Sequence, residues 1–270
     1  MRISVSNIAW DPAEDQQIAR VLRGHGVSAI DVAPAKYFPD PFRAGDADIR
    51  RVREWWSARD ISIYGMQALL HGTQGLNLFG APEVRRRMHE HLAEVCRIGE
   101  ALGATRLAFG SPRNRDRGQL SDDEVHAIST EFFQRLGDTA ARHGLVICLE
   151  PNPPHYGGNF MTDSAGTVAV VRAVGHDHVR MLLDTGAMTL NGEAASAVIP
   201  ALAALVGHIH LSEPDLVPLG DGATDHDEFS AWLPRLLPGH TVTVEMLATV
   251  GEAHERPIDR ALQLACRRYS

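Results

Sequence analysis

The chain alternates short β-branched or apolar runs with longer helical stretches, and this alternation occurs eight times. Polar, glycine or proline residues lie between each run and the stretch that follows it. Such a pattern predicts parallel strands joined by crossover helices. The eight predicted strands span residues 2–6, 28–33, 61–66, 105–109, 145–149, 179–183, 207–211 and 241–245. Eight strand–helix units in 270 residues are what a closed barrel requires.

A doubly wound open sheet is the alternative fold for alternating strands and helices. Such a sheet more often has about five to seven strands and a glycine-rich first turn. No GxGxxG motif follows the run at residues 2–6, and no linker is long or polar enough to divide the chain. We therefore expect an α/β fold, a single (β/α)8 TIM barrel domain over residues 1–270.

Local signals mark several helix ends. Residues 11–14 (DPAE) and 121–124 (SDDE) each have the spacing of a capping box at a helix N-terminus. Gly24, Gly103 and Gly144 each precede a predicted strand and are expected at helix C-termini.

Composition limits the partners of the protein. The 26 Lys and Arg residues against 34 Asp and Glu residues give a formal net charge of −8, which repels a nucleic-acid backbone. No apolar run approaches the roughly 18 residues of a membrane span, and the N-terminus lacks the pattern of a signal peptide. Cys96, Cys148 and Cys266 are widely spaced and form no CxxC motif. We expect a cytoplasmic protein that binds a small molecule and neither nucleic acid nor membranes.

Metal-ligand residue types stand at the ends of the last four predicted strands. These residues are Glu150, Asp184, His210 and Glu245. The active site of a TIM barrel lies where the strands end, so the four side chains should meet there. Any one of them could instead cap a helix or pair with a basic neighbour. Three carboxylates at one barrel mouth repel each other strongly without a cation, so the set of four favours a divalent metal site.

Other polar residues follow the predicted strands and are expected to contact a substrate. They are Asn7, Lys36, Tyr37, Gln67, His71 and Arg115. His208 lies one layer deeper than His210 on the same inward face, and it is expected to be a packed or hydrogen-bonded histidine. For Asp184 we expect a metal ligand rather than a helix cap, with Gly186 allowing a sharp turn that leaves the mouth open.

The order Glu, Asp, His, Glu on the last four strands resembles the xylose-isomerase-like barrel superfamily. Within it, the chain is similar to the sugar isomerase/epimerase branch that includes the D-tagatose 3-epimerase and hydroxypyruvate isomerase families. The motifs that carry the resemblance are LEPN at 149–152, LLDTG at 182–186, HIHLSEPDLVPLGDG at 208–222 and VTVEM at 242–246. Within these motifs, Asn152 and Glu213 are expected to contact the substrate.

The resemblance implies a metal-dependent isomerase acting on a sugar or a sugar derivative. Glu150, Asp184, His210 and Glu245 would bind one divalent metal, and the two glutamates would exchange protons with the substrate through a metal-stabilised enediolate. An oxygen-rich ligand set favours Mn²⁺, with Mg²⁺ or Co²⁺ as alternatives. Because the two glutamates come from well-separated strands, they can flank the substrate, which favours an epimerase over an isomerase.

Two positions depart from the pattern of the family. A histidine is common three residues after the aspartate, where this chain has Ala187, and ketose epimerases have an arginine six residues after the histidine, where it has Leu216. These losses predict a changed substrate pocket. A metal-dependent dehydratase and a non-catalytic binding protein with a vestigial site are alternatives. An apurinic endonuclease shares the fold but fits the acidic chain poorly. Homo-oligomers are common among the relatives, and a homo-oligomer is left open.

Overall fold

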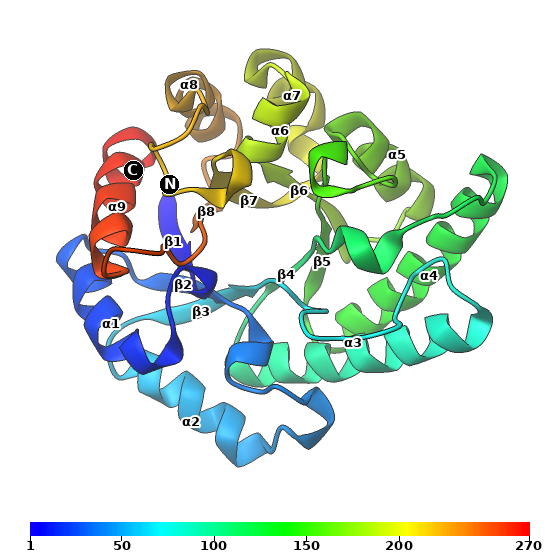
Figure 1. Ribbon diagram of the computed structural model, residues 1–270, viewed down its shortest axis with the longest axis horizontal. Coiled ribbons are helices and arrows are strands. Elements are labelled where there is room, and N and C mark those ends of the chain that lie inside the picture. Colours follow the sequence, from blue (N-terminus) through cyan, green and yellow to red (C-terminus); the bar gives the residue numbers. More distant parts are fainter.

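Eight parallel strands close into a barrel in which each strand pairs with its neighbours in the chain, and β8 pairs with β1. A computed structural model describes residues 1–270 and shows this barrel end-on in Figure 1. The strands are β1 (Arg2–Ser6), β2 (Ala29–Val32), β3 (Ser62–Met66), β4 (Arg106–Phe109), β5 (Val146–Leu149), β6 (Val179–Asp184), β7 (Val206–Ser212) and β8 (Thr241–Glu245). All eight overlap the predicted strands, so the predicted TIM barrel is confirmed.

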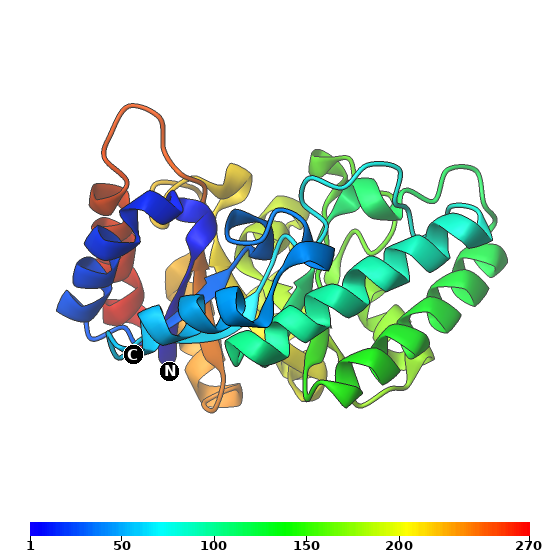
Figure 2. The same ribbon diagram turned by 90° about the horizontal axis from the view of Figure 1, so that it is seen from below.

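Helices surround the barrel, and the connection after β6 contains two of them (Figure 1). They are α1 (Asp15–Gly24), α2 (Asp46–Ser57), α3 (Pro82–Leu102), α4 (Asp122–Arg142), α5 (Ser164–Val174), α6 (Thr185–Asn191), α7 (Ala195–Leu202), α8 (His226–Leu236) and α9 (Glu255–Tyr269). None of these helices is both long and apolar enough to cross a membrane. Both chain termini lie on the face opposite the long loops that follow the strands (Figure 2).

The predicted helix ends are largely confirmed. Both capping boxes form, although the one at residues 11–14 begins a 3-10 turn that leads into α1. Gly103 and Gly144 adopt the left-handed conformation, with φ of 83° and 67°. Gly24 is the last residue of α1, and Gly26, with φ of 70°, takes the left-handed position instead.

The inside of the barrel holds a buried polar layer in addition to the apolar core between strands and helices. Ser4, Asp31, His208 and Thr243 are at most 1% exposed and come from β1, β2, β7 and β8. Because β2 and β7 are not neighbours in the barrel, the contact between Asp31 and His208 crosses its interior. This layer lies directly below the residues at the strand ends. The three cysteines are unpaired.

Candidate metal and substrate site

A cavity of about 490 Å³ opens at the carboxyl ends of the strands. All eight strands, or the segments that follow them, contribute to its wall. The lining residues are Ile8, Ala33, Ala35, Lys36, Gln67, Ala68, His71, Gly110, Ser111, Pro112, Glu150, Pro151, Asn152, Tyr156, Asp184, Ala187, Glu213, Leu216, Glu245 and Leu247. The volume is in the range of about 300–1,000 Å³ that is usual for small-molecule sites.

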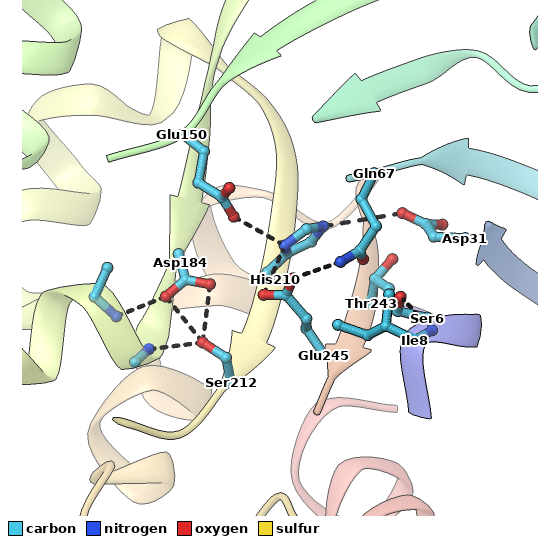
Figure 3. A network of polar contacts seen from close by, with 12 residues as sticks. Ser6, Ile8, Asp31, Gln67, Glu150, Asp184, His210, Ser212, Thr243 and Glu245 are labelled. Atoms are coloured by element: carbon cyan, nitrogen blue, oxygen red, sulfur yellow. Dashed lines mark hydrogen bonds and ion pairs between the residues drawn. The ribbon is translucent and has the colours of Figure 1, made fainter. Parts of the chain in front are cut away.

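The four predicted metal ligands meet at one end of this cavity: Glu150, Asp184 and Glu245 line it, and His210 is buried next to them (Figure 3). Glu150, Asp184, His210 and Glu245 each offer one ligand atom, and these atoms all lie within 4.8 Å of one another. His210 Nδ1 lies 3.2 Å from Glu150 Oε1 and 3.1 Å from Glu245 Oε2. The barrel register brings them together, since Asp184 pairs with His210 and Ser212 pairs with Glu245.

Three ionised carboxylates would be unfavourable in this cluster, as the pKa shifts of its members show. Burial raises the pKa of Asp184 to about 8, and repulsion from Glu245 and Glu150 adds to the shift. Burial opposes the charge on His210, but the carboxylates of Glu245 and Glu150 outweigh it and raise the pKa of His210 well above its usual value. Burial also opposes ionisation of Glu245, but His210 and a hydrogen bond from Gln67 lower its pKa. The cluster therefore takes up protons, and a divalent cation could replace them.

The donor set itself fits a divalent metal. Three carboxylates and one imidazole provide hard oxygen ligands and one nitrogen, as Mn²⁺, Mg²⁺ and Co²⁺ accept. A cation would also compensate the negative charge that otherwise requires protons on Asp184 and His210.

Asp184 caps a helix and borders the metal-ligand cluster at the same time. Its Oδ1 accepts a hydrogen bond of 2.6 Å from the amide of Ala187, at the start of α6. Ser212 Oγ donates to the same carboxylate, at 2.9 Å from Oδ1 and 2.8 Å from Oδ2. The expectation that excluded a cap was therefore wrong. The cap and Ser212 together fix the direction in which this carboxylate faces the cavity.

Gly186 has a different purpose from the expected one. It lies inside α6 without a positive φ, so no special turn requires glycine there. A Cβ atom at this position would lie 2.7 Å from Ser212 Oγ and 2.8 Å from the carbonyl oxygen of Glu213. Glycine is therefore needed for close packing of α6 against the end of β7, and this packing holds Ser212 against Asp184.

Five of the predicted substrate-binding residues line the cavity. They are Lys36, Gln67, His71, Asn152 and Glu213. Gln67 Nε2 donates to Glu245 Oε1 at 2.5 Å and so orients that carboxylate. Lys36 Nζ donates to the carbonyl oxygens of Asn7, at 2.7 Å, and Trp10. Burial lowers the pKa of Lys36, and neighbouring Asp11 and Asp15 partly offset this effect.

Glu213 lines the cavity, but its carboxylate is committed to the loop that follows β7. Its oxygens accept hydrogen bonds of 2.8 Å from the amides of Gly220 and Thr224, and one oxygen lies 2.9 Å from His226 Nε2. Burial opposes ionisation, but these hydrogen bonds, with that from His226 the largest, lower the pKa of Glu213. The geometry supports a role in holding the loop more than the expected contact with a sugar hydroxyl.

Three other predicted residues do not line the cavity. Asn7 is fully buried, and its side-chain oxygen accepts from the amide of Ala33 at 2.7 Å. Tyr37 points outward and donates its hydroxyl to Asp15 at 2.8 Å. Arg115 is 1% exposed, and none of its side-chain nitrogens has a hydrogen-bond partner. Burial lowers the pKa of Arg115 to about 10, against the opposing effect of Glu150.

Three residues of the site were not recognised in the sequence: Asp31, Gly110 and Ser212. Asp31 lies within an apolar strand rather than at its end, and a charged residue in such a run was the available signal. Ser212 reaches Asp184 only through the pairing of β6 with β7. Gly110 lies where a Cβ atom would come 1.6 Å from Glu150 Oε2, a contact that only the folded chain shows.

Gly110→Ala is expected to displace the carboxylate of Glu150 and to weaken metal binding by about 10- to 100-fold, the range for changes that disturb ligand orientation. The free energy of unfolding should change by less than about 1 kcal/mol, because the carboxylate can swing into the cavity. Titration calorimetry with Mn²⁺ measures the affinity. Gly24→Ala is the matched control, since its Cβ atom would meet nothing within 4 Å. Equal Mn²⁺ affinity in both variants would contradict the prediction.

Fold and site together define a TIM-barrel protein with a candidate divalent-metal centre at the mouth of the barrel. The chain belongs to the xylose isomerase-like TIM barrel family, whose model matches residues 19–267. No curated protein matches the sequence.

Solved structures share the whole fold. A D-psicose 3-epimerase in the presence of D-fructose has a TM-score of 0.83 and 17% identity, over 99% of both chains. The 3-keto-D-glucoside 4-epimerase YcjR from E. coli has a TM-score of 0.80 and 16% identity, also over 99% of both chains. The IolI protein with a bound zinc atom has a TM-score of 0.76 and 16% identity, over 100% of both chains. At these identities the likeness shows the common fold.

Proposed function

We propose that the protein is a divalent-metal-dependent sugar epimerase in which Glu150 and Glu245 exchange protons with the substrate. The observation that carries this proposal is the placement of the two carboxylates. Glu150 directly follows β5 and Glu245 ends β8, two strands that are not neighbours in the barrel, and both carboxylates line the cavity and contact His210 Nδ1 (Figure 3). The sugar epimerases with the same fold support it.

The chain's own residues divide the proposed reaction between them. Glu150, Asp184, His210 and Glu245 would hold the cation, which when bound would supply positive charge next to the substrate carbonyl and acidify the adjacent C–H bond. One glutamate removes that proton, and the other returns a proton from the opposite face, so the carbon is inverted. Gln67 keeps Glu245 oriented for this transfer through its 2.5 Å hydrogen bond. We propose Mn²⁺ as the metal, with Mg²⁺ or Co²⁺ as alternatives.

Apolar side chains line the cavity at the two positions where the family has a histidine and an arginine. Ala187 and Leu216 both line the cavity, and Leu247 lies beside them, with its amide donating to the carbonyl oxygen of Leu216 at 2.9 Å. This apolar wall offers no hydrogen bond to a sugar hydroxyl. It supports a substrate that carries an apolar attachment, or fewer hydroxyls, on this side. The likeness to a 3-keto-D-glucoside epimerase is consistent with a sugar that bears a second group.

The direct test is to incubate the Mn²⁺-loaded protein in D₂O with free ketoses and with keto-glycosides, and to follow the products by NMR and mass spectrometry. An epimerase gives a product with one deuterium at the inverted carbon and no loss of water. Loss of water would instead identify a dehydratase. Lys36 lines the cavity, but its ammonium group donates to the carbonyl oxygens of Asn7 and Trp10, so the structure gives no specific support to a dehydratase. A protein that binds Mn²⁺ but transforms no sugar would favour a binding protein.

D-Fructose, D-tagatose and D-psicose are expected to be poor substrates even with metal bound. Because the wall at Ala187 and Leu216 cannot hydrogen-bond their hydroxyls, kcat/KM should be about 10²-fold below that of the best keto-glycoside. Steady-state rates for the same substrate series measure this ratio. Leu216→Arg should narrow the gap by improving the free ketoses. Efficient turnover of any free ketose by the unmodified protein would show that the apolar wall does not determine specificity.

A further inference from the structure

A buried chain of polar groups runs from the proposed metal site into the barrel. His210 uses its two ring nitrogens in different directions: Nδ1 faces Glu150 and Glu245, and Nε2 faces Asp31 (Figure 3). Nε2 lies 4.0 Å from Asp31 Oδ2 and has no hydrogen-bond partner. The same oxygen of Asp31 lies 2.6 Å from His208 Nε2. One carboxylate therefore lies between two imidazoles, and all three residues are at most 1% exposed.

The strands next to Asp31 leave space for its carboxylate. The register between β2 and β3 shifts at this point: Ile30 pairs with Ile63 and Asp31 pairs with Gly65, so the extra residue lies on β3. On β3, Gly65 faces the carboxylate, and a Cβ atom there would lie 2.5 Å from Asp31 Oδ2. Ser4 Oγ donates to the other oxygen of Asp31 at 3.1 Å. The register shift places Gly65, the residue without a side chain, opposite the buried carboxylate, and such irregularities commonly redirect side chains beside active sites.

The position of Asp31 bears on which ring nitrogen of His210 carries the proton. A neutral imidazole has one N–H and one free lone pair, and only the lone pair can bind a metal. Nδ1 is the nitrogen directed at Glu150 and Glu245, so the proton must be on Nε2 when a cation is bound. Asp31 Oδ2 is the carboxylate oxygen next to Nε2, and a movement of about 1 Å would bring the pair into hydrogen-bond distance.

We propose that Asp31 is a positioning residue that accepts the Nε2 proton of His210 and thereby presents Nδ1 to the metal, while His208 holds Asp31 in place. This inference rests on the proposed metal site. Asp31, His208 and His210 could also be considered as ligands of a second cation. That alternative is less well supported, because neither Asp31 nor His208 lines the cavity and both are at most 1% exposed.

The first experiment uses the unmodified protein. With ¹⁵N-labelled histidine and diamagnetic Mg²⁺, long-range ¹H–¹⁵N NMR identifies which nitrogen of each histidine carries the proton. The expected result is a neutral His210 protonated at Nε2, and a His208 protonated at Nε2. A His210 protonated at Nδ1 in the metal-bound protein would overturn the proposal, and no variant needs to fold for this result.

The second experiment compares Asp31→Asn with Asp15→Asn. Asn keeps the shape of Asp31 but lacks its negative charge, so its oxygen is a weaker acceptor for the Nε2 protons of the two imidazoles; Mn²⁺ affinity should fall by about 10- to 100-fold, and His210 should lose its preference for the Nε2 tautomer. Asp15 is the matched control, because it is also buried and hydrogen-bonded, to Trp10 and Tyr37, but does not face the site. Unchanged Mn²⁺ affinity and an unchanged His210 tautomer in Asp31→Asn would overturn the positioning role of Asp31 and leave the proposed function unaffected.

The metal titration also separates this inference from the proposed function. One Mn²⁺ per chain supports both, whereas two Mn²⁺ per chain, with the second lost in Asp31→Asn, would show a second cation site and overturn the positioning role. If the unmodified protein binds no divalent cation, the proposed function itself fails, and the inference fails with it.

Discussion

Replacing either Glu150 or Glu245 by glutamine is expected to lower turnover by about 10²–10⁴-fold, the usual contribution of a positioned acid or base. Glutamine keeps the length of the side chain and one oxygen that can bind a metal, but it cannot carry the proton. Metal affinity should therefore fall much less than turnover. Comparing kcat with Mn²⁺ affinity for each variant separates proton transfer from metal binding.

Exchange with D₂O shows what each glutamate does. The unmodified protein should place one deuterium at the inverted carbon, whereas each variant should lose inversion. The variant that keeps the glutamate next to the substrate proton could still exchange deuterium into unreacted substrate, and the other variant should not. Glu193→Gln is the matched control, because Glu193 is half-buried and bonded to Ser164 outside the cavity. Near-normal turnover in both Glu150→Gln and Glu245→Gln would limit these residues to metal binding and make His71 the next residue to test.

The sequence was sufficient to predict the fold and the cluster of metal-ligand residues, for one physical reason. In a parallel barrel every strand ends at the same mouth, so a residue's place at a strand end already determines where its side chain lies. Glu150 directly follows β5, and Asp184 and Glu245 end β6 and β8. The apolar runs that precede these residues allow the strand ends to be predicted from the sequence. Their convergence within 4.8 Å follows from the topology.

The residues that surround the cluster could not be predicted in this way. Whether a side chain after a strand points into the cavity depends on loop conformation and on its partners, and neither has a simple sequence pattern. Tyr37 follows β2 as Lys36 does, but its hydroxyl is held by Asp15 on the outer side of the barrel. Gly110 and Asp31 matter through contacts with Glu150 and His208, which lie 40 and 177 residues away in the chain. Only packing shows such contacts.

Binding of Mn²⁺ is expected to release nearly two protons per cation at pH 7. Without metal, the pKa of Asp184 is raised to about 8 by burial and by Glu245 and Glu150, and the pKa of His210 is raised well above its usual value by the same carboxylates. Both groups are therefore protonated at pH 7, and a cation must displace both protons. Apparent Mn²⁺ affinity should rise by roughly tenfold or more per pH unit below pH 8. Calorimetry in buffers of different ionisation enthalpy counts the protons.

The same two shifts determine how stability depends on pH. Asp184 and His210 both have a higher pKa in the folded chain than in the unfolded chain, so the folded protein binds more protons. Their contribution to stability is present at low pH and is lost as the pH rises through the folded pKa, which is about 8 for Asp184. The metal-free protein should therefore lose stability from about pH 4 to pH 8 through Asp184, and from about pH 6.5 upward through His210. Mn²⁺ at 100 times its Kd should add about 2.7 kcal/mol of stability. At a fixed Mn²⁺ concentration, the difference in Tm between Mn²⁺ and EDTA should widen as the pH rises, because Mn²⁺ then binds more tightly.

Asp184→Asn tests whether the cluster causes this behaviour. An asparagine oxygen can still accept from the amide of Ala187 and so keep the cap of α6, but the side chain no longer ionises. The metal-free variant should show a flatter dependence of Tm on pH than the metal-free parent, and Mn²⁺ should stabilise it much less. If the variant keeps the steep pH dependence and the full response to Mn²⁺, then Asp184 serves α6 alone, and the metal and the titration must be assigned to other groups.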